Sequence, residues 1–421
     1  MSVDLIQAVT TIQACKKGQT QFASQTSLEQ RAQYLESVAV LIEAHSEEFV
    51  EAEFAVTKID KGFLRRHLIR YVLHSLRQVA QELRGFDYRP NEILSPVGLV
   101  AVITPWALGL RFFIERFAPS FAAGNSTIWK PSPDSQQIVP LISHLFKQAG
   151  VPPESYGFVT GDKEIGEFIV QHPSVNAVSF VGSSRVGEII MQKTAGKHKR
   201  LQLQLSTKNA AVVMADCDFR QQMPNILNSC LAGQGQLCWN TRRILLQESI
   251  ANDFVTQLKS SLDSLNPKIR LRSPHQLEFV RTAVEKMKQE HGKIVWGGDD
   301  LSDDSNLEIR PVFILDLPNC SEYQQQDLEL PLVTMGTIKY QHEAGKWLNA
   351  GYLGQAASLW GDSAKMQKLA AQLQYGHFWI NSWLEPDDKP ICGLQQSSFG
   401  PQDYRFNGSF FSDAKTLTTL F

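Results

Sequence analysis

The chain has 421 residues, 43% of them hydrophobic and 20% charged, with a formal net charge of −2 at pH 7. This length is too great for one compact core and predicts two or three domains. The charge balance excludes a basic surface for nucleic acid or anionic lipid, and no apolar run reaches the roughly 20 residues of a membrane span. The first residues lack the basic-then-apolar layout of a signal peptide, which indicates a cytoplasmic protein.

Residues 1 to about 85 are predicted to be helical, because SLEQ at 27–30 resembles a capping box and apolar residues follow at helical spacing. From residue 97 on, short β-rich runs alternate with helical patterns. Strands are expected at 97–104, 126–130, 156–161 and 177–182, and helices at 113–123 and 137–150. This alternation is typical of parallel βαβ units. It predicts a doubly wound α/β sheet, which binds ligands at the carboxyl ends of its strands.

A second alternating region follows, with β-rich runs at 210–214, 242–247 and 378–381. The tail, residues 408–421, has the pattern of an amphipathic strand. Because an unpaired strand edge is unfavourable, we expect this tail to cross to another subunit.

The stretch FVGSSRVG at 180–187 closes one predicted strand and opens a helix. Its two glycines, Gly182 and Gly187, would let a phosphate approach the backbone N–H groups of the helix N-terminus. A plain turn is the alternative, since the spacing is neither that of a dinucleotide fingerprint nor that of a P-loop.

The cysteines are considered together because a thiol can be core, disulfide, metal ligand or nucleophile. None forms a CxxC pair or has zinc-ligand spacing, and a reducing compartment disfavours disulfides. The six lie at Cys15, Cys217, Cys230, Cys238, Cys320 and Cys392. No metal site is expected. Cys238, in the stretch GQGQLCWN, is therefore either a core residue or a nucleophile.

Several stretches resemble, in order, the signatures of the aldehyde dehydrogenase superfamily. They are TPWALG (104–109), AAGNSTIWKPS (122–132), FVGSSRVG, LQLSTKN (203–209), GQLC (235–238), LELPL (328–332), WIN (379–381) and SDAKTLT (412–418). The resemblance covers nearly the whole chain. It implies two doubly wound α/β domains, a Rossmann-like cofactor domain and a catalytic domain, plus a small oligomerisation β-element.

The resemblance also implies site residues. Cys238 matches the nucleophile, whose thiolate attacks an aldehyde to give a thiohemiacetal and then a thioester. Lys130 matches the residue that holds the adenosine ribose, with a solvated lysine as the alternative. The other implied cofactor-binding residues, for NAD or NADP, are Thr104, Trp106, Ser132, Gly182, Ser183 and Asp327.

Two departures concern the chemistry itself. Where the family has an asparagine that donates to the oxyanion, this chain has Ala107, which has no side-chain donor. Where the family has a glutamate as general base for thioester hydrolysis, this chain has Gln204. An amide cannot accept a proton near neutral pH, so the usual deacylation route is missing.

Further departures lie on the cofactor side. Asp327 replaces the glutamate that orients the nicotinamide ribose, and Glu329 and Leu330 replace the aromatic residue and glycine that follow it. Pro133, with Asp134 beside it, stands where the family has an NAD-selecting glutamate. The choice between NAD and NADP therefore stays open.

The expected domains follow from the same resemblance. Residues 1–84 and 97–205 form the dinucleotide-binding domain, residues 206–395 form the catalytic domain, and 85–96 with 396–421 form oligomerisation strands. A homodimer or homotetramer is the expected assembly. Arg111 and Arg116 are expected to be surface or helix-face charges, with contact to an acidic substrate as the alternative.

Three functional interpretations remain open. The first is NAD(P)-dependent oxidation of a small aldehyde through Cys238, with impaired hydrolysis. The second is an acylating enzyme that passes its acyl group to a thiol such as coenzyme A, since TKNAAVVMADCD (207–218) resembles acylating members. The third is a non-catalytic homologue kept for nucleotide binding or assembly.

Overall fold

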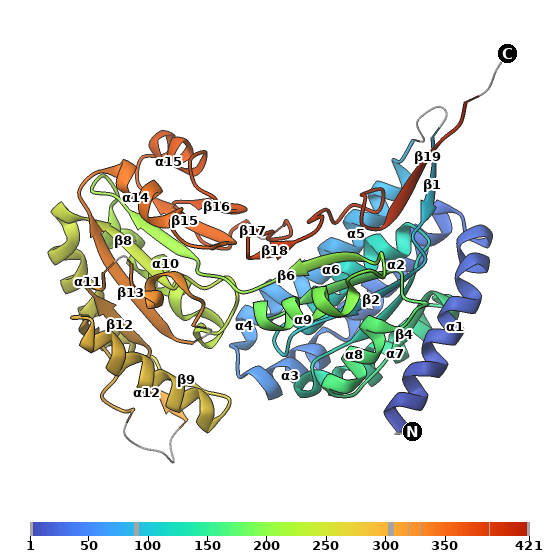
Figure 1. Cartoon of the computed structure of the whole chain (residues 1–421), viewed down its shortest axis with the longest axis horizontal. Coiled ribbons are helices and arrows are strands. Elements are labelled where there is room, and N and C mark those ends of the chain that lie inside the picture. Colours follow the sequence, from blue (N-terminus) through green and yellow to red (C-terminus); the bar gives the residue numbers. More distant parts are fainter. Residues whose placement is uncertain are drawn as a thin grey trace. The chain divides into compact units, whose positions relative to one another are not determined.

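The computed structural model of the chain describes residues 3–87, 92–301, 307–318, 320–328, 330–386 and 388–418 (Figure 1). These form two compact units. Unit 1 comprises residues 1–205, 388–390 and 399–421, and unit 2 comprises residues 206–387 and 391–398. Each unit is built on its own largely parallel sheet, as the α/β prediction requires.

Unit 1 begins with helices, as predicted. Ser27 and Gln30 form the capping box at the start of α2, and Ala32, Leu35 and Val38 are buried on one face of that helix. The helices of unit 1 are α1 (Val3–Gln25), α2 (Leu28–Ala44), α3 (Ser46–Thr57), α4 (Lys61–Leu64), α5 (Arg70–Arg84), α6 (Gly109–Ala122), α7 (Val139–Gln148), α8 (Lys163–Gln171) and α9 (Ser184–Thr194). A π-helical turn, Arg65–Ile69, joins α4 to α5.

The main sheet of unit 1 has the strand order β18-β6-β5-β2-β3-β4, and the strands from β6 to β4 are parallel. They are β2 (Leu99–Ile103), β3 (Ser126–Lys130), β4 (Tyr156–Phe158), β5 (Ala177–Val181) and β6 (Arg200–Gln204), with the short β18 (Ser398–Phe399) at the edge. Side chains of α1, α8 and α9 pack on one face through Ile12, Ile169 and Ile190. β2, β3 and β5 are buried along nearly their whole length, which explains why they read as continuous apolar runs.

Unit 2 holds a seven-stranded sheet with the order β10-β12-β13-β8-β7-β15-β16, in which β10 alone is antiparallel to its neighbour. Its strands are β7 (Ala210–Val213), β8 (Arg243–Gln247), β10 (Lys293–Trp296), β12 (Val312–Leu315), β13 (Leu332–Ile338), β15 (Ala356–Trp360) and β16 (His377–Ile380). Unit 2 also has two short antiparallel pairs of strands. They are β9 (Ile269–Arg270) with β11 (Glu308–Ile309), and β14 (Leu353–Gly354) with β17 (Leu394–Gln395).

Within the described residues, unit 2 has six α-helices. They are α10 (Phe219–Leu231), α11 (Ala251–Leu265), α12 (Pro274–Gln289), α13 (Glu322–Gln325), α14 (Gln341–Leu348) and α15 (Ser363–Ala370). Leu348 of α14 and Leu369 of α15 pack with Val212 and Leu359 of the sheet in one apolar cluster. No helix within the described residues is both long enough and apolar enough to cross a membrane.

The C-terminal strand corrects one prediction. β19 (Ser412–Thr416) pairs antiparallel with β1 (Glu92–Pro96) of the same chain, from Glu92 opposite Thr416 to Pro96 opposite Ser412. The tail therefore does not need another subunit as its first strand partner. Ile93 of this two-stranded ribbon is exposed, as is Leu417 directly after β19, and the role of the ribbon in oligomerisation stays a prediction. Parts of the two predicted oligomerisation segments, residues 88–91 and 419–421, lie outside the described residues.

Candidate active site

In unit 1, the predicted site residues lie at one edge of the sheet. Thr104 follows the last residue of β2, Lys130 ends β3, Gly182 follows β5, and Gln204 ends β6. These four strands are adjacent and parallel, so their carboxyl ends share an edge. This is the edge at which doubly wound sheets bind ligands.

Lys130 is 5% exposed, so the alternative of a solvated lysine is wrong. Its ammonium donates to the carbonyl oxygen of Pro131 at 3.2 Å, and its stem packs near Gly166 of α8. Burial lowers the pKa of Lys130, while the charge of Asp162 raises it. A buried ammonium with only one hydrogen bond among the described residues is suited to bind hydroxyl groups of a ligand.

Thr104, Trp106 and Ser132 surround the ends of β2 and β3. The Thr104 N–H donates to the Lys130 carbonyl at 3.3 Å, and its hydroxyl accepts a hydrogen bond from Trp129 at 2.9 Å. Ser132 precedes a short 3-10 helix and is half-buried, as is Trp106. Thr104 thus has a structural role in joining β2 to β3, and its contact with a cofactor stays a prediction.

The glycines of the 180–187 turn have different roles. Ser183 is the N-cap of α9, and its hydroxyl accepts from the Val186 N–H at 3.4 Å. A Cβ on Gly187 would come within 2.4 Å of the Leu205 side chain, so this glycine permits close packing of helix on strand. Gly182 lies just before α9, and its own N–H donates to the Gln204 carbonyl oxygen at 3.1 Å, so a phosphate at this turn stays a prediction. The phosphate interpretation therefore rests on Gly182 and Ser183.

The loop that carries Ala107 is held by a buried carboxyl group that the sequence did not identify. Leu108 has φ 54°, in the left-handed region, and its N–H donates to Glu53 at 2.6 Å. Glu53 belongs to α3 and is buried, which raises its pKa to about 7. Only the positive φ of a leucine next to Ala107 would have suggested an anchor there, and φ cannot be read from the sequence.

Gln204, at the general-base position, is bound by Arg116. The Arg116 Nη2 donates to the Gln204 side-chain oxygen at 2.9 Å, and Gln204 is 2% exposed. The Gln204 backbone oxygen accepts from the Gly182 N–H at 3.1 Å, which joins the ends of β5 and β6. The side chain is therefore held in one place in the interior of unit 1.

The expectation that Arg111 and Arg116 are surface charges is wrong. Arg116 is fully buried and is paired with Glu115 at 2.6 Å. Arg111 donates to the His67 carbonyl at 2.7 Å and stacks over the ring of Tyr71 at 3.5 Å. Both arginines lie on α6, all of which is buried, so neither is available as a solvated charge. An amphipathic pattern predicts burial of apolar residues only. It therefore does not reveal an arginine that is buried in an ion pair with several hydrogen bonds.

In unit 2, Cys238 follows an unusual stretch of backbone. Gly233, Gln234 and Gly235 all have φ near +60°, at 62°, 63° and 59°. Glycine adopts this conformation without a steric penalty, which explains the glycines before the cysteine. The Leu237 N–H donates to the Asn240 side chain at 2.8 Å. The loop is thereby fixed, and Cys238 itself is half-buried.

Two residues hold Cys238 that the sequence analysis missed. The Thr207 hydroxyl and the Asn209 side-chain amide donate to the Cys238 carbonyl oxygen at 2.8 and 2.6 Å. No local pattern marks either contact, because Thr207 and Asn209 lie 31 and 29 residues before Cys238 in the chain. Thr207 and Asn209 precede β7, and Cys238 precedes β8. Their contacts with the Cys238 carbonyl therefore lie at the amino ends of two adjacent strands.

Three of the other cysteines are held in the protonated form by burial. Burial raises the pKa of Cys15 and of Cys230 to about 12, and that of Cys217 to about 11. These thiols stay protonated at neutral pH and are poor nucleophiles.

Asp327 and Lys208 lie on the same edge of unit 2. An Asp327 oxygen accepts the Thr207 N–H at 3.0 Å, so this carboxylate binds its own chain. Burial lowers the pKa of Lys208 to about 7, the charge of Asp327 raises it, and Arg242 and Arg243 lower it further. The Lys208 ammonium makes no hydrogen bond within the described part of the chain. Glu329, the next predicted departure, lies outside the described residues.

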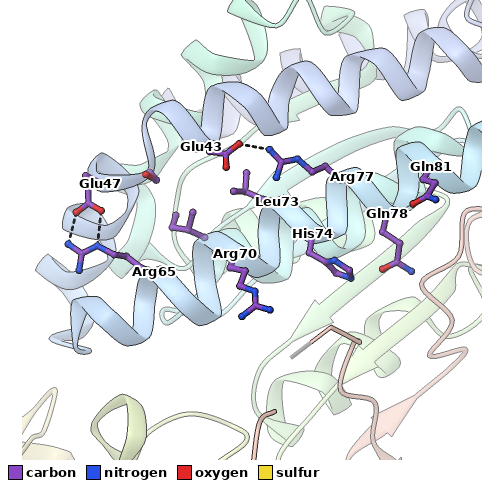
Figure 2. Close-up of a pocket in the computed structure, with 11 residues that line it drawn as sticks. Glu43, Glu47, Arg65, Arg70, Leu73, His74, Arg77, Gln78 and Gln81 are labelled. Carbon is purple, nitrogen blue, oxygen red and sulfur yellow. Dashed lines mark hydrogen bonds and ion pairs between the residues drawn. The ribbon is translucent and has the colours of Figure 1, made fainter. Parts of the chain in front are cut away.

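A pocket of about 620 Å³ lies on the helices of unit 1 (Figure 2). Arg65 pairs with Glu47, and Arg77 pairs with Glu43, so two of its basic residues are neutralised. None of its lining residues is a predicted site residue. The pocket is therefore a feature separate from the sheet edge that carries Lys130 and Gln204.

Comparison with known proteins gives one consistent family. A family model described as "Aldehyde dehydrogenase family" matches residues 2–417. The 2-aminomuconic semialdehyde dehydrogenase of Bos taurus is 30% identical over 94% of this chain and 87% of its own length. The 2-hydroxymuconic semialdehyde dehydrogenase of Pseudomonas sp. (strain CF600) is 28% identical over 93% of this chain and 87% of its own.

A solved structure agrees in fold. The NAD+ complex of aldehyde dehydrogenase from Bacillus cereus matches with a TM-score of 0.89 at 22% identity, over 97% of this chain and 88% of that one. At this identity the similarity concerns the fold alone.

Proposed function

The chain belongs to the aldehyde dehydrogenase family, and we propose that it oxidises an aldehyde through Cys238 and releases the product slowly. It is an oxidoreductase that acts on aldehydes with NAD or NADP as acceptor. The observation that supports Cys238 as the nucleophile is its fixed loop, in which Thr207 and Asn209 both hold the Cys238 carbonyl.

The residues of unit 1 fit a dinucleotide. Lys130 offers a buried ammonium for ribose hydroxyls, and Ser183 caps the helix whose N-terminus suits a pyrophosphate. When bound, NAD(P) accepts a hydride from the substrate carbon. Thr104, Trp106, Ser132 and Asp327 are proposed to complete the cofactor site.

Cys238 would carry both covalent steps. Its thiolate attacks the aldehyde carbon, a C–S bond forms, and the carbonyl π electrons move to the oxygen. The oxyanion then reforms the carbonyl as hydride leaves, which gives a thioester on Cys238. Water must finally attack this thioester, which releases a carboxylic acid and the free thiol.

The last step is the one we propose to be impaired. Thioester hydrolysis needs a base to take a proton from water, and Gln204 cannot act as one. The expected result is a burst of reduced nicotinamide, at most one per Cys238, followed by slow turnover. Short aliphatic aldehydes and succinic semialdehyde, mixed rapidly with protein and NAD+ or NADP+, test this directly. No burst with any of them would contradict the proposal and favour the non-catalytic homologue.

A second measurement isolates hydrolysis. In an Ala107→Asn background, which restores the family's oxyanion donor, Gln204→Glu should speed decay of the acyl-enzyme, as followed by mass spectrometry. Because Arg116 would lower the pKa of the new carboxyl group, we expect the lower end of the roughly 10²–10⁴-fold gain of a positioned base. Coenzyme A added to the unaltered protein should speed decay only if the acylating alternative holds.

The names of the relatives favour a semialdehyde as the substrate. Assembly as a homodimer or homotetramer and a cytoplasmic location stay predictions. The six cysteines are all free, which accords with a reducing compartment.

A further inference from the structure

We propose that Glu53 is a positioning residue for cofactor binding, because it holds the loop of residues 104–108 in the conformation that presents Trp106 to the dinucleotide. This inference rests on the proposed function, in which Thr104 and Trp106 belong to the cofactor site. All of the residues concerned lie in unit 1.

The loop joins β2 to α6 and is attached at both of its ends. At its first residue, the Thr104 N–H donates to the Lys130 carbonyl oxygen at 3.3 Å. At its last residue, the Leu108 N–H donates to a side-chain oxygen of Glu53 at 2.6 Å. Residues 105–107 lie between these two contacts. Their path is therefore set by one contact with the sheet and one with α3.

Leu108 adopts a conformation that a leucine ordinarily avoids. Its φ and ψ are 54° and 30°, in the left-handed region, which is unfavourable for a residue with a Cβ. The chain has little room to adjust at the next residue, since a Cβ on Gly109 would come within 3.3 Å of the Thr104 hydroxyl. A left-handed leucine persists only where the surrounding structure imposes that conformation.

Glu53 supplies that constraint from α3. The residue is 4% exposed and Leu108 is 1% exposed, so their hydrogen bond is shielded from water. Without an acceptor in this place, the Leu108 N–H would be buried and unpaired. The left-handed strain would also lose the contact that offsets it. The loop would then rotate at Leu108, which turns the peptide groups of the residues before it.

This loop lies at the edge of the sheet where the cofactor is proposed to bind. β2 and β3 are adjacent and parallel, with Ile103 opposite Lys130, so the loop leaves the sheet beside Lys130. Trp106 is half-buried. When only a fraction of the molecules holds a binding-competent conformation, the apparent affinity falls by that fraction. Glu53 therefore acts on cofactor binding through the loop.

The test is the dissociation constant for NAD+ and for NADP+, measured by calorimetry on folded protein. Glu53→Met keeps the bulk of the side chain but has no strong acceptor, so binding should weaken roughly tenfold. Glu53→Gln keeps the acceptor, and because burial raises the pKa of Glu53 to about 7, it also resembles the protonated carboxyl group. This variant should bind like the unaltered protein. Glu53→Leu, which also lacks an acceptor, serves if Glu53→Met does not fold.

A second comparison isolates the strain at Leu108. Glycine adopts the left-handed conformation without a steric penalty. In a Leu108→Gly background, adding Glu53→Met should therefore weaken binding several-fold less than it does in the unaltered protein. The cost of losing the leucine side chain is the same for both proteins in that background, so it cancels in the comparison.

The outcomes separate a positioning role from a structural one. Weaker binding in Glu53→Met, normal binding in Glu53→Gln and a smaller effect beside Leu108→Gly support the proposal. Unchanged binding in a folded variant without the acceptor overturns it, because a purely structural role would lower only the melting temperature. Equal weakening in Glu53→Gln, or an equal effect beside Leu108→Gly, overturns it as well. Absence of dinucleotide binding by the unaltered protein is a separate result, which contradicts the proposed function itself.

Discussion

The two units place their site residues at opposite ends of parallel strands. In unit 1, Lys130 and Gln204 end their strands. In unit 2, Thr207 and Cys238 precede β7 and β8, and Asp327 precedes the adjacent β13. The rule that α/β sheets bind ligands beyond their carboxyl ends therefore describes the predicted site of unit 1 and not that of unit 2.

The difference follows from the chemistry that each edge is proposed to perform. Helices begin beyond the carboxyl ends of strands, so that edge offers N–H groups to phosphate, as α9 does after β5. A thiol does not need a helix N-terminus. The positive charge near the amino ends in unit 2 comes instead from the buried side chains of Arg242 and Arg243 and, below about pH 7, from Lys208. Variants in unit 1 should thus change cofactor binding, and variants in unit 2 should change the thiol.

The largest expected effect concerns Cys238. Cys238→Ala should abolish covalent capture of an aldehyde or of iodoacetamide at neutral pH and lower any turnover by several orders of magnitude. Cys392→Ala is the control, since Cys392 is also half-buried in unit 2. If mass spectrometry found the label mainly on Cys217, Cys230 or Cys320, Cys238 would not be the nucleophile. The amino edge of the unit 2 sheet would then have no special role.

Next comes a pair of opposite pH dependences, one from each unit. Glu53 has its pKa raised to about 7 by burial, so the folded protein holds its proton above pH 4.5, and stability should fall as pH rises from about 4.5 to 7. Burial lowers the pKa of Lys208 to about 7, so stability should rise as pH increases from about 7 to 10.5. Each slope should approach about 1.4 kcal/mol per pH unit at most.

Variants separate these slopes from all other titrations. Glu53→Gln keeps an acceptor for Leu108 and should be more stable than the unaltered protein above pH 7, by an amount that disappears toward pH 4.5. Lys208→Met should lose the rise in stability above pH 7. Thermal unfolding across this range, compared with the unaltered protein, gives both differences. If the difference in stability between a variant and the unaltered protein did not change with pH, the group would have the same pKa in the folded and the unfolded protein.

A smaller effect is expected from Lys130. Lys130→Ala should weaken dinucleotide binding by roughly ten- to a hundredfold, through loss of a charge-assisted hydrogen bond to ribose. Lys163→Ala, at an exposed position that begins α8, is the matched control. Calorimetric titration with NAD+ and NADP+ measures both. An unchanged dissociation constant in Lys130→Ala, with iodoacetamide capture by Cys238 also unchanged, would leave the carboxyl edge of unit 1 without its assigned role.

The sequence predicted what depends on local pattern and missed what depends on contacts between distant segments. β3 matches its predicted range, residues 126–130, and β5 differs from its own by one residue, because fully buried strands read as apolar runs. The placement of Lys130 at a strand end followed from that, whereas the strand that ends at Gln204 was not predicted. The partner of Gln204 was not predicted either, since Arg116 lies 88 residues away in the chain, and a buried arginine in a helix has no sequence signature.

The smallest expected effect tests the contact that joins Thr207 to the nucleophile loop. Thr207→Val has nearly the same shape but loses the hydroxyl that donates to the Cys238 carbonyl at 2.8 Å. Asn209 still donates to that oxygen, so the loss should be about 1 kcal/mol, or roughly a fivefold slower capture of iodoacetamide. Thr207→Ser keeps the hydroxyl and should react like the unaltered protein, while dinucleotide binding should be unchanged in both variants. If Thr207→Ser were the slower of the two, packing of the Thr207 methyl group and not its hydrogen bond would hold the loop. The hydrogen bond from Asn209 would then be the one that fixes the Cys238 carbonyl.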